Sequence, residues 1–327
     1  ASVKNYIVKK YESEDYEHWN TFISKTKNAT FLFHRDFMEY HNDRFLDASL
    51  VVLDDEKWIA VLPAHQIDEV IYSHNGLTYG GLVYDEKIRI SVFLAIYRSL
   101  LVYLNDEKIT KLHLKTIPSI YHKKPAEEIN YALFLTDAKL VRRDTLSVID
   151  LSKPYTISRK RREGIRRGPK NNLVIKEELN FELFWNKILI PNLANKHQAK
   201  PVHTLSEIVA LQKKFPENIR HFNVYFNEEI VAGTTIFVSD QVAHPQYVSG
   251  QNEKNELGSL DYLYHYLITE VFKDKHFFDF GISNEEQGKK LNEGLIFWKE
   301  SFGTNVIIQD FYEVETNNFQ MLDNVII

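Results

Sequence analysis

The chain contains 327 residues, of which 44% are hydrophobic and 26% are charged, so it is long enough to build two domains with packed cores. It has no cysteine, which excludes disulfide bonds, thiolate metal sites and a cysteine nucleophile, and its 13 histidines show no zinc-binding spacing. The net charge of −5 argues against general affinity for nucleic acid, so no DNA partner is expected. The lack of any signal-like or membrane-length apolar run predicts a cytoplasmic protein with no transmembrane segment.

The first half of the chain predicts an α/β unit. Charged turn residues join two paired strands, and a glycine-rich loop follows them. Apolar residues at three- and four-residue steps, such as Phe93, Ile96 and Leu100, predict a helix with one buried face. In chain order the expected elements are a hairpin (49–53, 57–66), the loop (73–81), a helix (86–104), a strand (110–116), a helix (125–136) and a strand (138–150).

The second half repeats this order of elements without repeating the residues. Its main helix shows the same apolar spacing at Leu263, Tyr264 and Leu267. Because hairpins accompany the strand–helix–strand parts in both halves, mixed sheets are expected rather than wholly parallel ones. The expected elements are a hairpin (219–226, 230–238), a further strand, a polar loop (250–258), a helix (259–272), a strand (276–280), a helix (285–302) and a strand (305–312).

A turn-forming break near Ser152, Lys153 and Pro154 separates the two halves. We therefore predict an N-terminal domain of residues 1–152 and a C-terminal domain of residues 153–327. Ligands usually bind in clefts between domains, so a cleft between these two is the expected site.

The densest charge cluster follows this break. Residues 158–170 contain seven basic side chains and one acidic side chain. Ser158 is suited to cap a helix, and Gly168 followed by Pro169 is suited to end one, so the sequence predicts a short helix here.

One face of this basic helix would carry Arg159, Arg162 and Arg166, while Arg161 and Ile165 would share a face that contacts the core. Guanidinium groups bind phosphate through charge-assisted hydrogen bonds worth about 1.5–3 kcal/mol each. The pattern favours a phosphate-binding surface at the domain junction. The alternative is a solvated basic face without a ligand.

The sequence motifs of several enzyme classes are absent. There is no P-loop, no G-x-G-x-x-G after a strand, no G-x-S-x-G and no H-E-x-x-H. Transfer of an activated acyl group to an amine needs none of these motifs. Such a protein must hold the amine near the carbonyl, accept its proton and stabilise an oxyanion.

Three separated segments together resemble the FemABX-like proteins of the GNAT acyltransferase superfamily. One is the loop SHNGLTYGGL at 73–82, and another is the basic segment SRKRREGIRR at 158–167. The third is FDFGI at 278–282, which is followed by NEGL at 292–295 and by WKESFG at 298–303. This last stretch is similar to the family's strand, loop and F-K-x-x-F-G end.

The resemblance implies an α/β fold of two tandem GNAT-like (acyl-CoA N-acyltransferase-like) domains. It also implies transfer of an acyl or aminoacyl group to an amine of a cell-wall or surface-polysaccharide precursor. Family members that build peptidoglycan bridges take the amino acid from aminoacyl-tRNA, and other superfamily members use acyl-CoA. We therefore expect no tightly bound cofactor, acyl-CoA or aminoacyl-tRNA as donor, a phosphate-bearing glycan or nucleotide-sugar as acceptor, and tRNA as a further partner.

Two features depart from the family pattern. The stretch 181–215 is interrupted by Pro191 and Pro201 and does not predict the long helical hairpin of the peptidoglycan enzymes. The loop at 251–259 has two acidic residues and one glycine, unlike the pyrophosphate loop of acyl-CoA enzymes. The loop at 73–81 has three glycines, which let the backbone approach a ligand closely, so the donor loop stays undecided.

Three residues are candidates for catalysis: Asp279, Tyr247 and His74. Asp279 lies in an apolar strand, where a buried carboxylate needs a partner or serves as a general base. Tyr247 follows an alternating strand at the position where GNAT folds splay their strands, with an ordinary core tyrosine as the alternative. His74 lies on the glycine-rich loop, where it would contact substrate or cap a turn.

The candidates for substrate binding are Tyr79, Gly80, Gly81, Arg161, Arg162, Arg166 and Lys299. Family resemblance makes Lys299 a phosphate or carboxylate contact, and the alternative is a surface lysine. A plain turn is the alternative for the two glycines. His34, Arg35 and His244 are further candidates without an assigned role, and no metal ligands are assigned.

The sequence thus predicts an N-acyltransferase or aminoacyltransferase. The amine of a phosphate-bearing precursor would attack an activated ester or thioester in the interdomain cleft. Two alternatives stay open: a non-catalytic GNAT-like module that binds a nucleotide-sugar or glycan, and RNA binding through residues 159–170.

Overall fold

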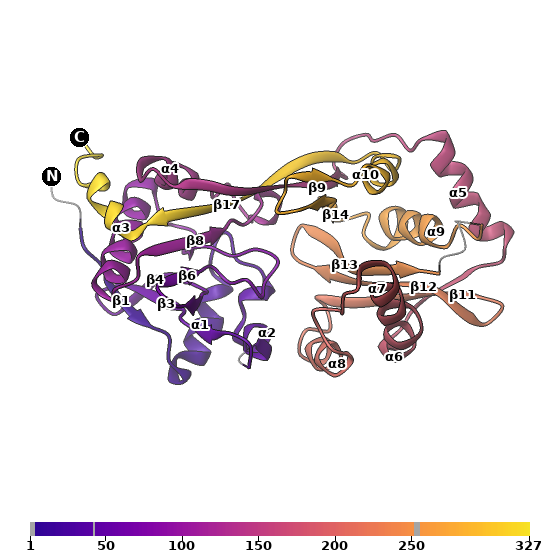
Figure 1. The fold of residues 1–327 in the computed structure, drawn as a ribbon, viewed down its shortest axis with the longest axis horizontal. Coiled ribbons are helices and arrows are strands. Elements are labelled where there is room, and N and C mark those ends of the chain that lie inside the picture. The colour runs from indigo at the N-terminus through magenta and orange to yellow at the C-terminus, as the bar shows by residue number, and fades with distance from the viewer. Residues whose placement is uncertain (1–3, 42, 252–255) are drawn as a thin grey trace. The chain divides into compact units, whose positions relative to one another are not determined.

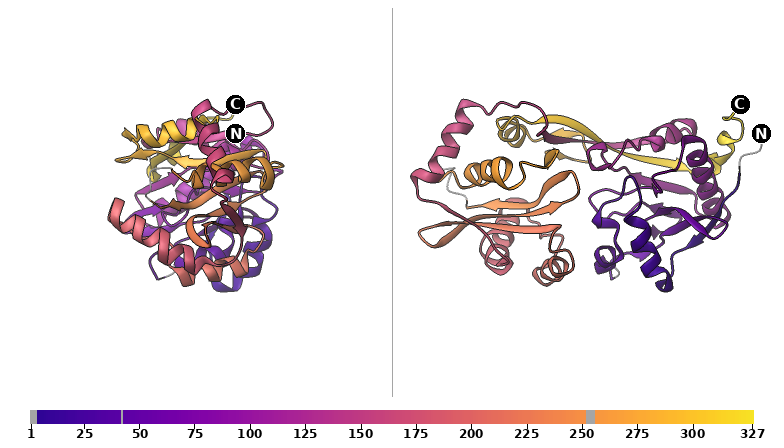
Figure 2. Two further views of the ribbon diagram at one scale, coloured as in Figure 1. Left: turned by 90° about the vertical axis from the view of Figure 1, so that its right-hand side faces the viewer. Right: turned by 180° about the vertical axis from the view of Figure 1, so that it is seen from behind.

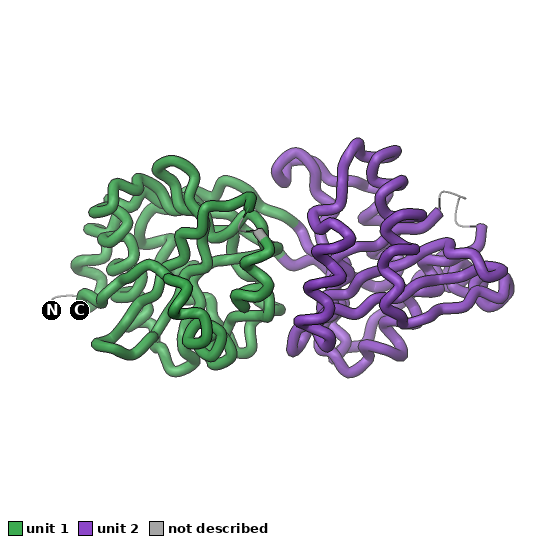
Figure 3. Tube along the Cα trace, turned by 90° about the horizontal axis from the view of Figure 1, so that it is seen from below, with its two compact units in different colours: residues 1–144, 308–327 green, residues 145–307 purple. Residues whose placement is uncertain are grey.

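The computed structural model describes residues 4–41, 43–251 and 256–327, and the chain divides into two compact units (Figure 3). Unit 1 contains residues 1–144 and 308–327, and unit 2 contains residues 145–307. The sequence-based division at residue 152 assigns all of residues 153–327 to one C-terminal domain. In the structure, the chain leaves unit 1 along β9 (Lys139–Asp150) and returns along β17 (Asn305–Glu315), so unit 2 is an insertion within the sequence of unit 1.

Unit 1 contains two sheets, with strand orders β1-β3-β4-β7 and β17-β8-β6-β5-β2 (Figure 1). Among its pairings with a described register, β6 with β8 is parallel and the others are antiparallel. The remaining strands are β1 (Ile7–Lys10), β2 (Leu46–Asp47), β3 (Leu50–Asp54), β4 (Lys57–Leu62), β5 (His65–Ile67), β6 (Val70–Tyr72), β7 (Val83–Tyr84) and β8 (Lys111–Lys115). The helices are η1 (Ser13–Asp15), α1 (Tyr16–Ile23), η2 (Phe31–Phe33), α2 (Arg35–Met38), η3 (Glu39–His41), α3 (Ile90–Asp106), η4 (Ser119–Tyr121), α4 (Glu128–Leu135) and η7 (Thr316–Leu322).

The longest helix of unit 1, α3, has the buried face that its sequence predicts. Phe93, Ile96 and Leu100 are all buried in the hydrophobic core of the unit. The helix begins at Ile90, later than expected, because Asp85 turns the preceding chain. The Asp85 carboxylate accepts from the N–H of Lys87, and its carbonyl accepts from the N–H of Ile88.

Unit 2 contains a sheet with the order β10-β11-β12-β13-β14-β9 and a small hairpin, β15-β16. The pairing of β13 with β14 is parallel and the neighbouring ones are antiparallel, so the expected mixed sheets are confirmed in both units. Its other strands are β10 (Val174–Glu177), β11 (Ile219–Phe226), β12 (Glu229–Val238), β13 (Val242–Gly250), β14 (Phe277–Ile282), β15 (Asn284–Glu285) and β16 (Lys290–Leu291). The helices are α5 (Arg159–Lys170), α6 (Phe181–Phe184), η5 (Trp185–Leu189), α7 (Ile190–His197), α8 (Leu205–Lys214), α9 (Ser259–Tyr266), η6 (Leu267–Val271) and α10 (Glu293–Glu300).

The basic helix α5 packs closely on α9, and two glycines make this possible. A Cβ at Gly164 would lie 2.0 Å from a carboxylate oxygen of Asp261, and a Cβ at Gly168 would lie 2.2 Å from the Tyr262 ring. The expected helix end at Gly168 and Pro169 is wrong, since α5 continues to Lys170. Gly168 serves the helix–helix contact rather than a left-handed cap.

The expected helix at 285–302 is also wrong in its first part. Residues 284–291 form the β15-β16 hairpin, whose turn places Glu286 and Gln287 at positive φ. The helix α10 begins only at Glu293, where the Asn292 side chain accepts a hydrogen bond from the N–H of Leu295.

Part of the predicted polar loop, residues 252–255, lies outside the described residues. Across the part of the chain that the structure describes, no helix combines the length and the apolar character needed to cross a membrane.

Candidate functional site

The parallel strands of unit 2 separate soon after they pair. The described register of β13 with β14 joins Val242 to Phe277 and Ala243 to Phe278. Just beyond, β14 shifts its register against β9 between Asp279 and Ile282, and β13 is irregular against β12. Beyond these pairs the two strands have no described register, and we call this break in their pairing the β13–β14 opening; backbone groups there have partners other than a neighbouring strand.

Asp279 anchors a tight turn at this opening. Its carboxylate is buried and accepts a hydrogen bond from the N–H of Gly281 at 2.7 Å, and Gly281 has a φ of +82°. From β13, the Nδ1 atom of His244 lies 2.8 Å from the Asp279 carbonyl oxygen and 3.6 Å from its carboxylate. Both neighbours accept hydrogen bonds, so we assign the ring proton to Nδ1, which makes Nε2 the acceptor of the ring.

Lys299, on α10, reaches the same turn. Its ammonium donates to the carbonyl oxygens of Gly281 at 3.2 Å and Ile282 at 2.7 Å. The side chain is buried, which rules out the surface-lysine alternative. Burial lowers the pKa of Lys299 to about 8, and the nearby charge of Asp279 offsets part of this effect. The structure therefore brings together two predicted site residues, Asp279 and Lys299, with His244, which had no assigned role.

Tyr247 belongs to a different cluster of unit 2. Its hydroxyl accepts a hydrogen bond from the backbone N–H of His203 at 3.1 Å and also contacts Nδ1 of that ring. The indole of Trp185 packs edge-on against Tyr247, with ring centroids 5.1 Å apart. A role for this buried hydroxyl in proton transfer stays a prediction.

The three arginines predicted to bind phosphate have different environments. The Arg161 guanidinium is buried, where it pairs with Asp261 at 2.5 Å and donates to the Ser301 hydroxyl at 2.8 Å. The predicted core contact of Arg161 and Ile165 is thus confirmed. Arg162 and Arg166 are exposed on α5, and Arg162 donates to the carbonyl of Ile157. Of the three arginines, the two with exposed side chains, Arg162 and Arg166, are accessible to an anion from solvent.

The glycine-rich loop of unit 1 fills the space where β6 and β8 separate. These strands pair in parallel up to Tyr72 and His113. The loop then returns to β8: the Ser73 hydroxyl accepts from the N–H of Lys115, and the N–H of Gly80 donates to the Lys115 carbonyl at 2.7 Å. A Cβ at Gly80 would lie 1.6 Å from the Ser73 carbonyl oxygen, so this position requires glycine.

The other predicted loop residues are held by unit 1 itself. The Tyr79 hydroxyl is buried and hydrogen-bonded to Thr30 at 2.7 Å, and Gly81 has a φ of +113°. The His74 Nδ1 accepts from the N–H of Gly76 at 3.2 Å. A substrate role for these residues and for Gly80 stays a prediction.

His74 lies beside a buried histidine that the sequence did not single out. The His65 ring is 5.1 Å from His74 and 4.6 Å from Phe45, between centroids, and its Nε2 accepts from the N–H of Asn75 at 3.1 Å. Burial lowers the pKa of His65 to about 4, while the charge of Asp47, its partner across β2 and β5, acts in the opposite direction. His65 is therefore neutral at physiological pH.

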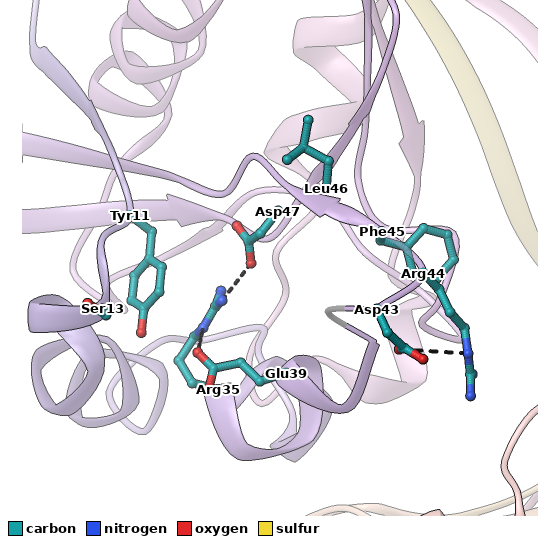
Figure 4. A pocket seen from close by; sticks show the side chains of 9 residues that line it. All are labelled: Tyr11, Ser13, Arg35, Glu39, Asp43, Arg44, Phe45, Leu46 and Asp47. Carbon is teal, nitrogen blue, oxygen red and sulfur yellow. Dashed lines mark hydrogen bonds and ion pairs between the residues drawn. The ribbon is translucent and has the colours of Figure 1, made fainter.

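Phe45 and Asp47 also line a cavity of about 580 Å³ within unit 1 (Figure 4). At its floor, the buried Arg35 donates to Glu39 at 3.2 Å and to Asp47 at 2.5 Å. The Arg35 guanidinium also stacks 3.9 Å from the ring centroid of Tyr11, whose buried hydroxyl has no hydrogen-bond partner among the described residues.

The charged lining of this pocket is predominantly acidic. The carboxylates of Glu39, Asp43 and Asp47 face the guanidinium groups of Arg35 and Arg44. Figure 4 shows the Arg35 group beside Tyr11 and the Asp43–Arg44 pair on the opposite side. Because Arg35 is engaged by two carboxylates, the pocket is better suited to hydroxyl and ammonium groups than to phosphate.

Sequence reasoning named Arg35 and His244 without a role and missed the carboxylates around Arg35. Glu39 could have been found, since it lies four residues after Arg35 on the same helical stretch. Asp47 carries no such local signal, because β2 brings it to the guanidinium. Among the described residues, no group of three or more His, Asp or Glu side chains is arranged to hold a metal ion.

Comparisons with known proteins find solved structures with a similar overall fold. No family model matches the chain, and no curated protein sequence matches it. The crystal structure of FemX is similar over 96% of this chain and 99% of that chain, with a TM-score of 0.67 and 10% identity. L-PGS from Bacillus licheniformis is similar over 96% of each chain, with a TM-score of 0.63 and 14% identity. A tandem GNAT protein from the clavulanic acid biosynthesis pathway is similar over 95% of this chain and 99% of that chain, with a TM-score of 0.50 and 11% identity.

Proposed function

Since the chain has the α/β fold of FemX and of tandem GNAT proteins, we propose that it is an N-acyltransferase or aminoacyltransferase acting on a cell-wall or surface-polysaccharide precursor. The observation that carries this proposal is the opening between β13 and β14, where Asp279, His244 and Lys299 gather. The opening lies wholly within unit 2, which makes unit 2 the better place for the acyl donor. In unit 1, the equivalent parallel pair is filled by its own loop.

The three side chains match the needs of acyl transfer. The amine nitrogen forms a bond to the acyl carbon, the ester C–O or thioester C–S bond breaks, and one proton must leave the nitrogen. Nε2 of His244 is the acceptor for this proton, since Nδ1 is committed to the Asp279 carbonyl. Asp279 is a positioning residue that holds the turn and the imidazole, and the ammonium of Lys299 provides positive charge for the developing oxyanion.

The acidic pocket of unit 1 would bind an ammonium or hydroxyl group of a ligand, separately from the amine that reacts at the β13–β14 opening. Glu39 and Asp47 retain acceptor positions beside Arg35 for such a group. Arg162 and Arg166 would contact the phosphate of the acceptor, as the sequence predicts. The cleft expected between the two halves, and the choice between acyl-CoA and aminoacyl-tRNA as donor, stay predictions.

The test is product formation, followed by mass spectrometry. The purified protein is incubated with acetyl-CoA or with charged tRNA, each with a UDP-linked amino sugar as acceptor. An acylated product that is lost in His244→Gln and in Lys299→Met, but kept in the exposed control Lys290→Met, supports the proposal. Binding of the amino sugar without product from either donor would instead favour the non-catalytic binding module.

A separate measurement tests the acidic pocket. Wild-type protein should bind a UDP-linked amino sugar more tightly than its N-acetylated form, because the acetyl group removes the positive charge. Glu39→Gln should reduce this preference, whereas Glu56→Gln, at an exposed turn of the same unit, should not. Equal binding of both sugars would contradict an ammonium-binding pocket.

A further inference from the structure

The end of α10 is fastened by polar contacts to α5 and α9, its neighbours in unit 2 (Figures 1 and 2). The indole of Trp298 donates to the buried carboxylate of Asp261, on α9, at 2.8 Å. The hydroxyl of Ser301 accepts from Nε of Arg161, on α5, at 2.8 Å and donates to the Trp298 carbonyl. The N–H of Ser158, which caps α5, also donates to the Ser301 carbonyl at 2.9 Å. We call the side chains of Arg161, Asp261 and Ser301 the α10 anchor.

Lys299 lies between two of the fastened residues, directly after Trp298 and two positions before Ser301. Its ammonium donates to the carbonyl oxygens of Gly281 and Ile282, so two of its three N–H donors are used. With these two directions set, the direction of the third donor depends on where α10 places the Lys299 backbone. The contacts with α5 and α9 therefore determine where the remaining donor of Lys299 points.

We propose that the α10 anchor positions Lys299, holding the end of α10 so that the third donor of this side chain meets the developing oxyanion. The inference rests on the proposed function, in which Lys299 serves that oxyanion. The role of the anchor residues is to act through Lys299 rather than on the reacting atoms. A displacement of a catalytic group by about 1 Å can lower the rate about a hundredfold, so fixing α10 in place matters for turnover.

Stability alone gives little reason for this network. Replacing a buried ion pair by apolar side chains of similar size is often neutral or stabilising. Apolar packing, however, sets the relative place of two helices less strictly than hydrogen bonds with defined lengths and directions. The Arg161–Asp261 pair is nearly enclosed, with side-chain exposures of 6% and 2%, and Gly164 omits a side chain to admit it. These features fit a helix end whose exact place is important.

The first experiment asks whether the anchor holds Lys299 in its buried place. Urea unfolding from pH 7 to 10.5 compares the wild type with Lys299→Met, and Ser301→Ala with the double variant. In the first comparison, the lowered pKa of Lys299, about 8, makes the difference in the free energy of unfolding rise with pH. Without the Ser301 hydroxyl, Lys299 should approach water and its pKa should return toward 10.5, so the second difference should rise about half as much or less. Equal rises in both comparisons would overturn the proposal.

The control is Ser99→Ala on α3 of unit 1. The Ser99 hydroxyl is also buried, accepts from the N–H of Tyr6 at 2.9 Å and donates to the Ala95 carbonyl at 2.8 Å. Its loss should lower the free energy of unfolding as Ser301→Ala does, but should leave the full Lys299-dependent rise with pH. Asp279, whose charge acts on Lys299, is present in every protein compared, so its contribution cancels.

The second experiment separates positioning from binding. With a donor and an acceptor that give product, Ser301→Ala should lower kcat about tenfold and change the KM of the acceptor less than about twofold. Trp298→Phe keeps an aromatic ring but removes the indole donor to Asp261, and it should act in the same direction. A loss confined to KM would contradict the proposal. If the wild type forms no product while the pH experiment gives the expected result, the hold of the anchor on Lys299 stands and only the proposed acyl transfer fails.

Discussion

The guanidinium of Arg161 and the carboxylate of Asp261 form a buried ion pair that joins α5 to α9 at 2.5 Å. Asp261 also accepts a hydrogen bond from the indole of Trp298 at 2.8 Å, so its charge is held from two sides. Gly164 makes room for this carboxylate, as its missing Cβ would collide with it. Arg161 is therefore committed to the fold of unit 2, in contrast to its exposed neighbours on the same helix.

Replacing Arg161 with Met should destabilise the protein strongly. The Asp261 carboxylate would be left buried without its partner, a change that typically costs about 3–5 kcal/mol. Arg162→Met, one position along the same helix but exposed, should change the free energy of unfolding by less than about 0.5 kcal/mol. Urea unfolding of both variants measures the difference. Similar values for the two would mean that the ion pair does not form as described.

Gly80→Ala should destabilise unit 1. The added Cβ would meet the Ser73 carbonyl oxygen at 1.6 Å, and backbone on both sides would have to move, at a cost of about 1–3 kcal/mol or more. The control is Gly294→Ala at the start of α10, where the nearest atom lies 3.8 Å away. This second change should be neutral or slightly stabilising, because alanine favours the helix. Thermal unfolding that ranks the two variants in the opposite order would contradict the packing of the loop.

The lowered pKa of Lys299 predicts a dependence of stability on pH. In the unfolded chain, the lysine has its ordinary pKa of 10.5, whereas in the folded protein its pKa is about 8. Between these values, the unfolded state binds more protons, so stability should rise with pH relative to a variant that lacks the group. Urea unfolding of the wild type and of Lys299→Met is measured from pH 7 to 10.5. The free energy of unfolding of the wild type, relative to that of the variant, should rise above about pH 8. A constant difference across this range would mean that the pKa is not lowered.

His65 predicts a second pH effect, in the acid range. Its pKa is about 4 in the folded protein and 6.5 in the unfolded chain, because burial disfavours the charged ring. The corresponding stability is fully present above about pH 6.5 and is lost progressively as the pH falls toward 4. His65→Gln should therefore flatten the acid side of the stability profile. Identical slopes for His65→Gln and the wild type would exclude a lowered pKa.

Much of the fold could be predicted because it follows from local patterns. The apolar spacing at Phe93, Ile96 and Leu100 predicts the buried face of α3, and the same logic places Ile165 and Arg161 toward the core. The expected α/β fold of two tandem GNAT-like domains with mixed sheets is confirmed by the similar structures. Element ends were less predictable. Glu286 and Gln287 adopt positive φ in the β15-β16 turn, a conformation that Glu and Gln rarely adopt and that their presence therefore does not predict.

The site was less predictable, because long-range pairing builds it. Asp279 was recognisable as a carboxylate in an apolar strand, but its partner His244 arrives from β13, 35 residues earlier in the chain. Arg35 likewise meets Asp47 only because β2 closes the edge of the sheet beside α2. The spacing of apolar residues along the sequence does not predict such long-range contacts. Lys299, in contrast, was identified because its segment resembles a family motif.

The insertion of unit 2 between β9 and the later part of β17 affects the order in which the chain can fold on the ribosome. β8 receives its β17 partner through Phe311–Glu315, which follow every residue of unit 2. At about 5–20 residues per second, synthesis of residues 145–307 takes roughly 8–30 s, during which this side of β8 has no strand to pair with. The later-encoded unit can therefore finish folding before the earlier one, and a nascent chain stalled within it would present an open sheet edge to chaperones.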